Sequence, residues 1–124
     1  LERLAQGETI PEADVPVYLL SVFHPNLQGY LKSFIHIDPK TELSNVTEPV
    51  LVVIGDTDIQ ITVKETEAMT KGISNATLVK IPGMSHVLKP GPEDRAGNMA
   101  TYNQPELVLH KDLMPAISSF LSKL

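Results

Sequence analysis

Cysteine and tryptophan are both absent from the 124 residues, and aromatic residues make up only 5% of them. Without cysteine the chain can form no disulfide, no thiolate zinc site and no cysteine nucleophile. Its longest apolar stretch runs from Val50 to Ile54, far below the roughly 20 residues that cross a bilayer, so we expect no transmembrane segment. The composition otherwise fits one ordinary globular domain, for which a cytoplasmic location is the default expectation.

Basic residues are also scarce. Lys and Arg total 10 against 15 Asp and Glu, which gives a formal charge of −5. No basic run is long enough to follow a phosphate backbone, so nucleic acid is not an expected partner. Asp, Glu and His do not cluster at metal-ligand spacing, and no glycine-rich phosphate loop or dinucleotide fingerprint is present, so we expect no metal and no cofactor. The first residue is Leu1 and not Met, which suggests either removal of an amino-terminal segment or a piece of a longer protein.

The amino-terminal part, residues 1–39, is predicted to be helical. Its first 16 residues read as irregular surface structure with a short helical pattern, whereas apolar residues at spacings of three and four mark an amphipathic helix after His24. Pro25 is expected in the first turn of this helix, with His24 near its cap position. The apolar stripe is Leu19, Leu20, Phe23, Tyr30, Leu31 and Phe34. We interpret it as core, with an apolar substrate channel beneath a lid as the alternative.

Residues 40–124 carry an α/β pattern. The run from Val50 to Ile54 is apolar on both faces, which is typical of a parallel strand covered by helices on each side. Thr62 and Glu65 have the spacing of a capping box ahead of a helix over Val63 to Lys71, and a second strand is predicted over Ala76 to Ile81. Strand, helix and strand in so short a span predict a βαβ unit, and hence an α/β fold with an incomplete sheet.

The carboxyl-terminal stretch is predicted to contain a long loop and one helix. Residues 89–110 read as a surface excursion, and loops of this length are uncommon unless they are functional. Asp112 is expected to cap a final helix that packs on the sheet. Its apolar stripe is Leu113, Ile117, Phe120, Leu121 and Leu124.

Acidic residues and a histidine follow the two predicted strands where each strand ends. Asp56 and Asp58 come after the first strand, and His86 follows the second. Because neighbouring parallel strands end at the same edge of a sheet, we expect Asp58 and His86 to meet there. A carboxylate that accepts the Nδ1 proton of an imidazole leaves Nε2 free to take a proton from a nucleophile. We therefore predict Asp58 as the catalytic acid and His86 as the general base, with Asp56 as the alternative acid and otherwise a turn residue.

The other residues that can carry chemistry are interpreted as structural. Gln60 is expected to steady the loop that holds the acid, with substrate contact as the alternative. Met84 is expected to fill a gap in the core, with a place in an acyl pocket as the alternative. Ser85 is expected to be a loop residue beside His86. Three histidines without a positioned acid in the sequence are expected to be structural: His24, His36 and His110.

Two motifs occur together at a defined spacing. An apolar strand followed by Gly-x-x-Asp is present as PVLVVIGDTD at residues 49–58, and Gly-x-x-His is present in IPGMSH at residues 81–86, with the His 28 positions beyond Asp58. Together they resemble the acid and histidine loops of the α/β-hydrolases, in particular the serine-aminopeptidase-like and monoacylglycerol-lipase-like branch. The resemblance is strong over residues 49–88. It is weak over residues 23–39, which are similar to the segment that returns from the lid to the core.

The resemblance implies that the chain is the carboxyl-terminal part of an α/β-hydrolase, with residues 1–39 as the lid-return segment and 40–124 as the core portion. It implies a serine hydrolase that cleaves a small-molecule ester or amide, in which Asp58 and His86 are two members of a Ser-Asp-His triad. The Gly-x-Ser-x-Gly elbow of the family is missing, because Val87 stands where GMSHV would need its second glycine. We therefore expect the serine and the oxyanion hole to lie outside this chain, which alone should be inactive.

A second, non-catalytic reading is that the chain is a truncated α/β-hydrolase-like module that self-associates. A two-stranded unit leaves one edge of Val50 to Ile54 unpaired, and an unpaired apolar edge favours pairing with another chain. The sequence therefore also predicts a homodimer or a larger assembly through the exposed sheet edge.

Overall fold

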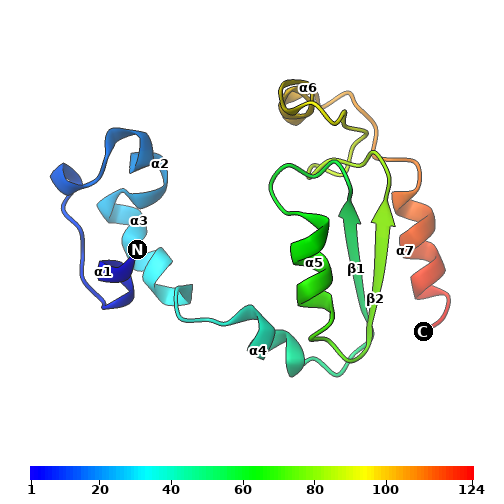
Figure 1. The fold of residues 1–124 in the computed structure, drawn as a ribbon, viewed down its shortest axis with the longest axis horizontal. Coiled ribbons are helices and arrows are strands. Elements are labelled where there is room, and N and C mark those ends of the chain that lie inside the picture. The colour runs from blue at the N-terminus through cyan, green and yellow to red at the C-terminus, as the bar shows by residue number, and fades with distance from the viewer. The chain divides into compact units, whose positions relative to one another are not determined.

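The computed structural model describes all 124 residues, which form two compact units, Leu1–Asp38 and Pro39–Leu124 (Figure 1). The division lies within one residue of the boundary expected from the sequence. The assignment of the first unit to a lid-return segment stays a prediction. No helix in the structure is both long enough and apolar enough to cross a membrane.

The first unit consists of short helices. They are α1 (Glu2–Ala5), the 3₁₀ helices η1 (Glu12–Asp14) and η2 (Val17–Leu19), α2 (Leu20–Phe23) and α3 (Pro25–Phe34). As predicted, Pro25 begins α3, and the His24 side chain accepts a hydrogen bond from the Asn26 amide at 3.3 Å. The short helical pattern expected near Leu1 forms as α1, whereas η1 adds a turn where the sequence predicted irregular structure, because local hydrogen bonds close a turn in each.

A buried amide side chain holds the first unit together. Gln28 of α3 is only 1% exposed, and its Oε1 accepts from the Ile10 amide at 2.7 Å. Its Nε2 donates to the carbonyls of Ile10 at 2.8 Å and Phe23 at 2.9 Å. One side chain therefore ties the extended stretch after α1 to the helices that follow it.

The apolar stripe of this unit is only partly core. Leu19 and Phe23 are half-buried, but Tyr30 is 70% exposed and Phe34 is 42% exposed. The two exposed rings pack edge to face, with their centroids 5.0 Å apart. The interpretation of the stripe as core is therefore wrong for Tyr30 and Phe34, which contact each other on the outer side of α3.

The second unit contains a two-stranded parallel sheet with a helix against each face, as the α/β prediction required (Figure 1). Strand β1 (Val50–Gly55) pairs with β2 (Ala76–Ile81) in a register that runs from Val50 beside Ala76 to Gly55 beside Ile81. The helices of this unit are α4 (Pro39–Ser44), α5 (Val63–Thr70), α6 (Arg95–Ala100), η3 (Thr101–Asn103) and α7 (Leu113–Leu121). The mixed helix and strand content is that of an α/β unit.

Helix α5 starts at the predicted capping box. Thr62 Oγ1 accepts from the Glu65 amide at 3.2 Å, and Glu65 Oε2 accepts from the Thr62 amide at 2.9 Å. These two bonds satisfy amides that the first turn of a helix leaves without partners. The crossover between the strands is therefore fixed at its amino end, directly after the loop that carries Asp58.

The core of the second unit lies between the sheet and α7. Ile81, Met84 and Leu113 are buried together, and three half-buried residues pack against them: Val53, Val79 and Ile117. Helix α7 packs on the sheet as predicted, but Leu121 and Leu124 are exposed, so the expected stripe is too long.

Asp112 stands at the N-cap position of α7, but its side chain makes no capping bond, contrary to the prediction. Its Oδ2 accepts instead from Lys111 Nζ at 2.7 Å. The Asp112 carboxylate therefore binds the neighbouring ammonium and not the amides of the first helical turn.

The stretch over residues 89–110 is not simply a surface loop. It contains α6 and η3, and the side chains of Asn98, Thr101 and His110 are buried within it. Helix α6 forms because Asp94 caps it, with Oδ1 accepting from the Gly97 amide at 2.8 Å. Figure 1 shows α6 beyond the carboxyl ends of β1 and β2.

Candidate active site

The candidate site lies where the two strands end side by side. The acid loop (residues 56–61) follows β1, and the histidine loop (residues 82–88) follows β2. Gly55, the last residue of β1, lies against the backbone of Met84, since a Cβ at Gly55 would lie only 1.7 Å from the Met84 carbonyl oxygen. Only glycine permits this approach, which brings the two loops within hydrogen-bond reach of each other.

The structure brings the two predicted catalytic residues together. His86 Nδ1 lies 3.0 Å from Asp58 Oδ2, within hydrogen-bond distance. The Asp58 side chain is 5% exposed and that of His86 is 35% exposed. In a neutral imidazole, a proton on Nδ1 that is shared with the carboxylate leaves Nε2 as an acceptor, and Nε2 makes no hydrogen bond to the protein.

The Asp58 carboxylate is held by the backbone of its own loop. Its Oδ1 accepts from the amides of Gln60 at 2.8 Å and Ile61 at 3.0 Å, while Oδ2 faces His86. Burial raises the pKa of Asp58, but the hydrogen bonds from Ile61, Gln60 and His86 together outweigh it, so this pKa lies below the ordinary value. Asp58 is therefore ionised at neutral pH and oriented toward the imidazole.

The Asp56 side chain binds the backbone of the histidine loop and not the imidazole. Its Oδ1 accepts from the Gly83 amide at 2.6 Å, and its own amide donates to the Ile81 carbonyl at 3.3 Å. Asp56 therefore links the acid loop to the histidine loop as a turn residue, and Asp58 is the carboxylate that contacts His86.

The two residues that precede His86 in the chain are buried. Met84 is 1% exposed and fills the core as expected, and it also lines an apolar groove beside His86, which was its alternative place. Ser85 is 1% exposed, and its hydroxyl donates to the Lys89 carbonyl at 3.0 Å. Leu88 adopts a left-handed backbone conformation with a φ of 62°, and its carbonyl accepts from the His110 amide at 2.8 Å. The histidine loop therefore turns sharply directly after the imidazole.

Two of the other histidines have acidic neighbours that the sequence did not indicate. His24 Nε2 lies 3.5 Å from Glu12 Oε2, and His110 Nδ1 lies 3.8 Å from Asp112 Oδ2. His110 Nδ1 also accepts from the Asp112 amide at 3.3 Å. The Glu12 carboxylate reaches His24 from η1, whereas the contact between His110 and Asp112 lies within one local turn. The interpretation of these histidines as structural stays a prediction. The structure places no group of three or more His, Asp or Glu side chains together where they could hold a metal.

Sequence reasoning missed two residues that contact the acid loop. Asn98 of α6 donates from Nδ2 to the Thr57 carbonyl at 2.7 Å, and the Tyr102 hydroxyl accepts from Gln60 Nε2 at 2.9 Å. Asn98 lies 41 positions from Thr57, and Tyr102 lies 42 positions from Gln60. Both belong to the stretch that was expected to be a surface loop. No local pattern marks such contacts, because only the tertiary fold creates them.

An apolar groove adjoins the pair on the side of β1. It has a volume of about 290 Å³, and Asp58 and His86 lie among its lining residues. Its apolar walls include Val52, Ile54, Ile61, Met69 and Leu88. The imidazole is therefore bordered by an apolar surface and not only by solvent.

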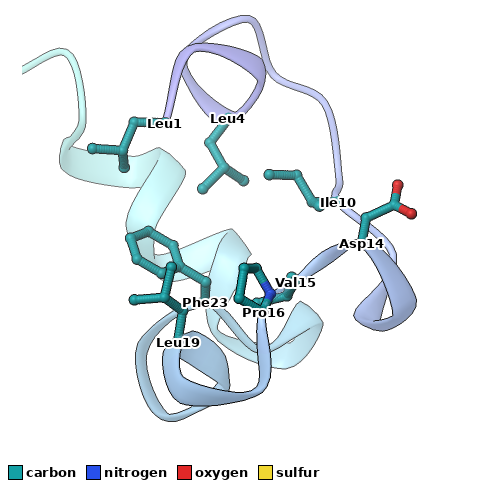
Figure 2. A pocket seen from close by; sticks show the side chains of 8 residues that line it. All are labelled: Leu1, Leu4, Ile10, Asp14, Val15, Pro16, Leu19 and Phe23. Atoms are coloured by element: carbon teal, nitrogen blue, oxygen red, sulfur yellow. The ribbon is translucent and has the colours of Figure 1, made fainter.

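The first unit contains a separate apolar pocket (Figure 2). It has a volume of about 310 Å³, and Leu4, Ile10, Leu19 and Phe23 are among its lining residues. Figure 2 shows these apolar side chains converging, whereas the carboxyl group of Asp14 points away from them. The Asp14 carboxylate lies 3.6 Å from Arg3 Nη1.

Comparison with known proteins adds no relative: no family model matches this chain, and neither does any curated protein or solved structure. The resemblance to the α/β-hydrolases therefore rests on the two loop motifs. The contact between Asp58 and His86 is an independent observation about the same residues.

Proposed function

We propose that Asp58 and His86 are the acid and the general base of a serine hydrolase of the α/β-hydrolase type. The proposed enzyme is cytoplasmic and cleaves small-molecule carboxylic esters or amides. Its nucleophilic serine lies outside these 124 residues. The single observation that carries the proposal is the 3.0 Å contact between Asp58 Oδ2 and His86 Nδ1 at the carboxyl ends of two parallel strands.

The arrangement of the pair supports general-base chemistry. Asp58 accepts the Nδ1 proton and keeps the imidazole in the tautomer whose Nε2 can take a proton from a serine hydroxyl. When that proton arrives, the carboxylate stabilises the imidazolium, and His86 later returns the proton to the leaving group. Asp58 is suited to this role because two amides and the imidazole keep it ionised.

The surroundings of the pair support an apolar substrate portion. His86 borders the apolar groove along β1, and its ring is exposed enough to meet a reactant. The nucleophilic serine, supplied from outside these residues, would have to come within hydrogen-bond reach of Nε2. The oxyanion hole would come from the same outside segment, because it includes the amide that follows the nucleophile.

The test begins with the reading frame on the amino-terminal side of Leu1, which should encode a strand, Gly-x-Ser-x-Gly and a helix. The encoded protein is then treated with a fluorophosphonate, which reacts with an activated serine. Labelling of the elbow serine that is lost in His86→Ala supports the proposal. A reading frame without the elbow, or labelling that His86→Ala leaves unchanged, contradicts it.

A second candidate function is self-association through the outer edge of β1. The specific observation is that β1 pairs with β2 alone, which leaves the other edge of an apolar strand without a partner. Two copies that join these edges would extend the sheet. Light scattering at micromolar concentration tests this proposal: a dimer or larger assembly supports it and a monomer contradicts it.

A further inference from the structure

Asn98 is a fully buried polar residue in a short helix beyond the end of the sheet. It is 0% exposed, and its Nδ2 donates to the carbonyls of Thr57 at 2.7 Å and Pro92 at 3.0 Å. Its Oδ1 has no hydrogen-bond partner. Burying an amide that is only partly satisfied is unfavourable, so an apolar side chain would serve better if packing alone were needed. The donor side of this amide therefore has a positional role.

The two carbonyls that Asn98 contacts belong to the surroundings of the two candidate catalytic loops. Thr57 lies in the acid loop directly before Asp58, and its carbonyl accepts the bond from Asn98. The same loop supplies the two amides, of Gln60 and Ile61, that bind the Asp58 carboxylate. Pro92 lies in the segment that leaves the histidine loop. One side-chain amide therefore joins the acid loop to the segment that follows His86.

The segment around Pro92 is itself fastened to the histidine loop. The Gly91 amide donates to the Gly83 carbonyl at 2.9 Å, and Met84 forms a β-bridge with Pro90. A Cβ at Gly91 would lie 2.6 Å from the Ser85 Cβ and 3.0 Å from Asn98 Nδ2, so glycine is needed for this packing. A displacement of α6 would therefore also move the backbone next to His86.

A second contact reaches Asp58 from the other side of its turn. The Tyr102 hydroxyl in η3 accepts from Gln60 Nε2 at 2.9 Å, and the Gln60 amide donates to Asp58 Oδ1 at 2.8 Å. Asn98 and Tyr102 thus contact the residues that stand one before and two after Asp58. Figure 1 places α6 beyond the strand ends, at the edge from which both loops leave the sheet.

We infer that the α6–η3 segment, residues 95–103, is a clamp that holds the acid loop in register with the histidine loop, with Asn98 and Tyr102 as positioning residues. The inference rests on the proposed roles of Asp58 and His86, because the clamp acts through them. Neither residue touches the reacting atoms. Their effect is to keep Asp58 Oδ2 within hydrogen-bond distance of His86 Nδ1.

The test is an NMR measurement on the whole chain that requires no turnover. The variant Asn98→Leu keeps nearly the size of the side chain and removes the donor to both carbonyls without adding a charge near Asp58. We expect the ¹³C titration of the Asp58 carboxyl to show a pKa closer to the ordinary value of about 3.9. We also expect ¹⁵N shifts of His86 to show a smaller fraction of the Nδ1–H tautomer. Unchanged values for both signals in a folded Asn98→Leu variant would overturn the inference.

The matched control is Gln28→Leu, the same chemical change at an amide that is 1% exposed and also donates to two backbone carbonyls. It lies in the first unit and should leave both Asp58 and His86 signals unchanged. A shift as large as that of Asn98→Leu would show a general effect of destabilisation and would overturn the inference.

If Asn98→Leu does not fold, Tyr102→Phe tests the inference in its place, because this half-exposed residue loses only its hydroxyl. It should move the Asp58 titration in the same direction by a smaller amount, and an unchanged titration would overturn the clamp. Because these signals do not depend on hydrolysis, a working clamp in a protein without esterase activity would contradict the proposed function alone.

Discussion

Gly55 lies so close to Met84 that a Cβ built on it would fall 1.7 Å from the Met84 carbonyl oxygen. At this point the backbone of β1 packs directly against the backbone of the histidine loop. A methyl group at this position cannot be accommodated by a side-chain rotation. The contact between Asp58 and His86 therefore depends on a glycine that takes no part in it.

Gly55→Ala should consequently destabilise the second unit. We expect a loss of roughly 3 kcal/mol in the free energy of unfolding, because strand and loop must move apart. The matched control is Gly29→Ala in the interior of α3, where a Cβ would meet nothing within 4 Å. That variant should gain about 1 kcal/mol from helix propensity. Urea unfolding measures both, and a Gly55→Ala protein as stable as the wild type would refute the close approach.

Stability should depend on pH through Asp58. Its folded-state pKa is lowered, so its contribution is fully present above the unfolded value of about 3.9 and is lost as the pH falls through the lower folded value. The unfolding free energy of the wild type should therefore decrease more steeply below about pH 4 than that of Asp58→Asn. Urea titrations at a series of acid pH values give both slopes. Equal slopes for the wild type and Asp58→Asn would show that the pKa of Asp58 is not lowered in the folded state.

The capping box should contribute measurably to α5. Thr62→Ala removes the acceptor for the Glu65 amide and should cost about 1 kcal/mol, whereas Thr62→Ser keeps a hydroxyl and should cost much less. Chemical denaturation of the two variants measures the difference. Equal stability of Thr62→Ala and Thr62→Ser would contradict the role of the hydroxyl.

Self-association through β1 can be tested with proline. The amides of Val50 and Asp56 point toward β2, where they donate to the carbonyls of Asn75 and Ile81. Because the direction of the amide alternates along a strand, the amide of Val52 also points toward β2 and that of Leu51 points outward. Leu51→Pro should keep the fold but abolish the assembly, and Val52→Pro should disrupt the sheet itself. Light scattering and circular dichroism distinguish these results, and an assembly that persists in a folded Leu51→Pro protein contradicts pairing through this edge.

The sequence predicted the parts of the structure that depend on local patterns. The apolar run of β1, the capping box at Thr62 and the proline at the start of α3 each act within a few residues, and each was located correctly. The meeting of Asp58 and His86 was also predictable, because the ends of adjacent parallel strands must lie at one edge.

The wrong predictions concern residues whose surroundings are set by tertiary contacts. Asn98 is polar and sits among prolines and glycines, so its sequence context indicates a surface loop, yet the fold buries it against Thr57. Asp112 has the residue type of a helix cap, but Lys111 takes its carboxylate. Tyr30 and Phe34 have helical spacing, which shows that they share a face but not which face is covered.

Kinetics of ester hydrolysis test most directly whether His86 is the general base of an esterase. The protein that joins residues 1–124 to the predicted serine segment would be assayed with p-nitrophenyl butyrate as wild type, His86→Ala and His36→Ala. His36 is exposed, and its replacement should leave kcat/KM unchanged. We expect His86→Ala to lower kcat/KM by roughly 10⁶-fold. Turnover by His86→Ala at the level of His36→Ala would contradict this expectation.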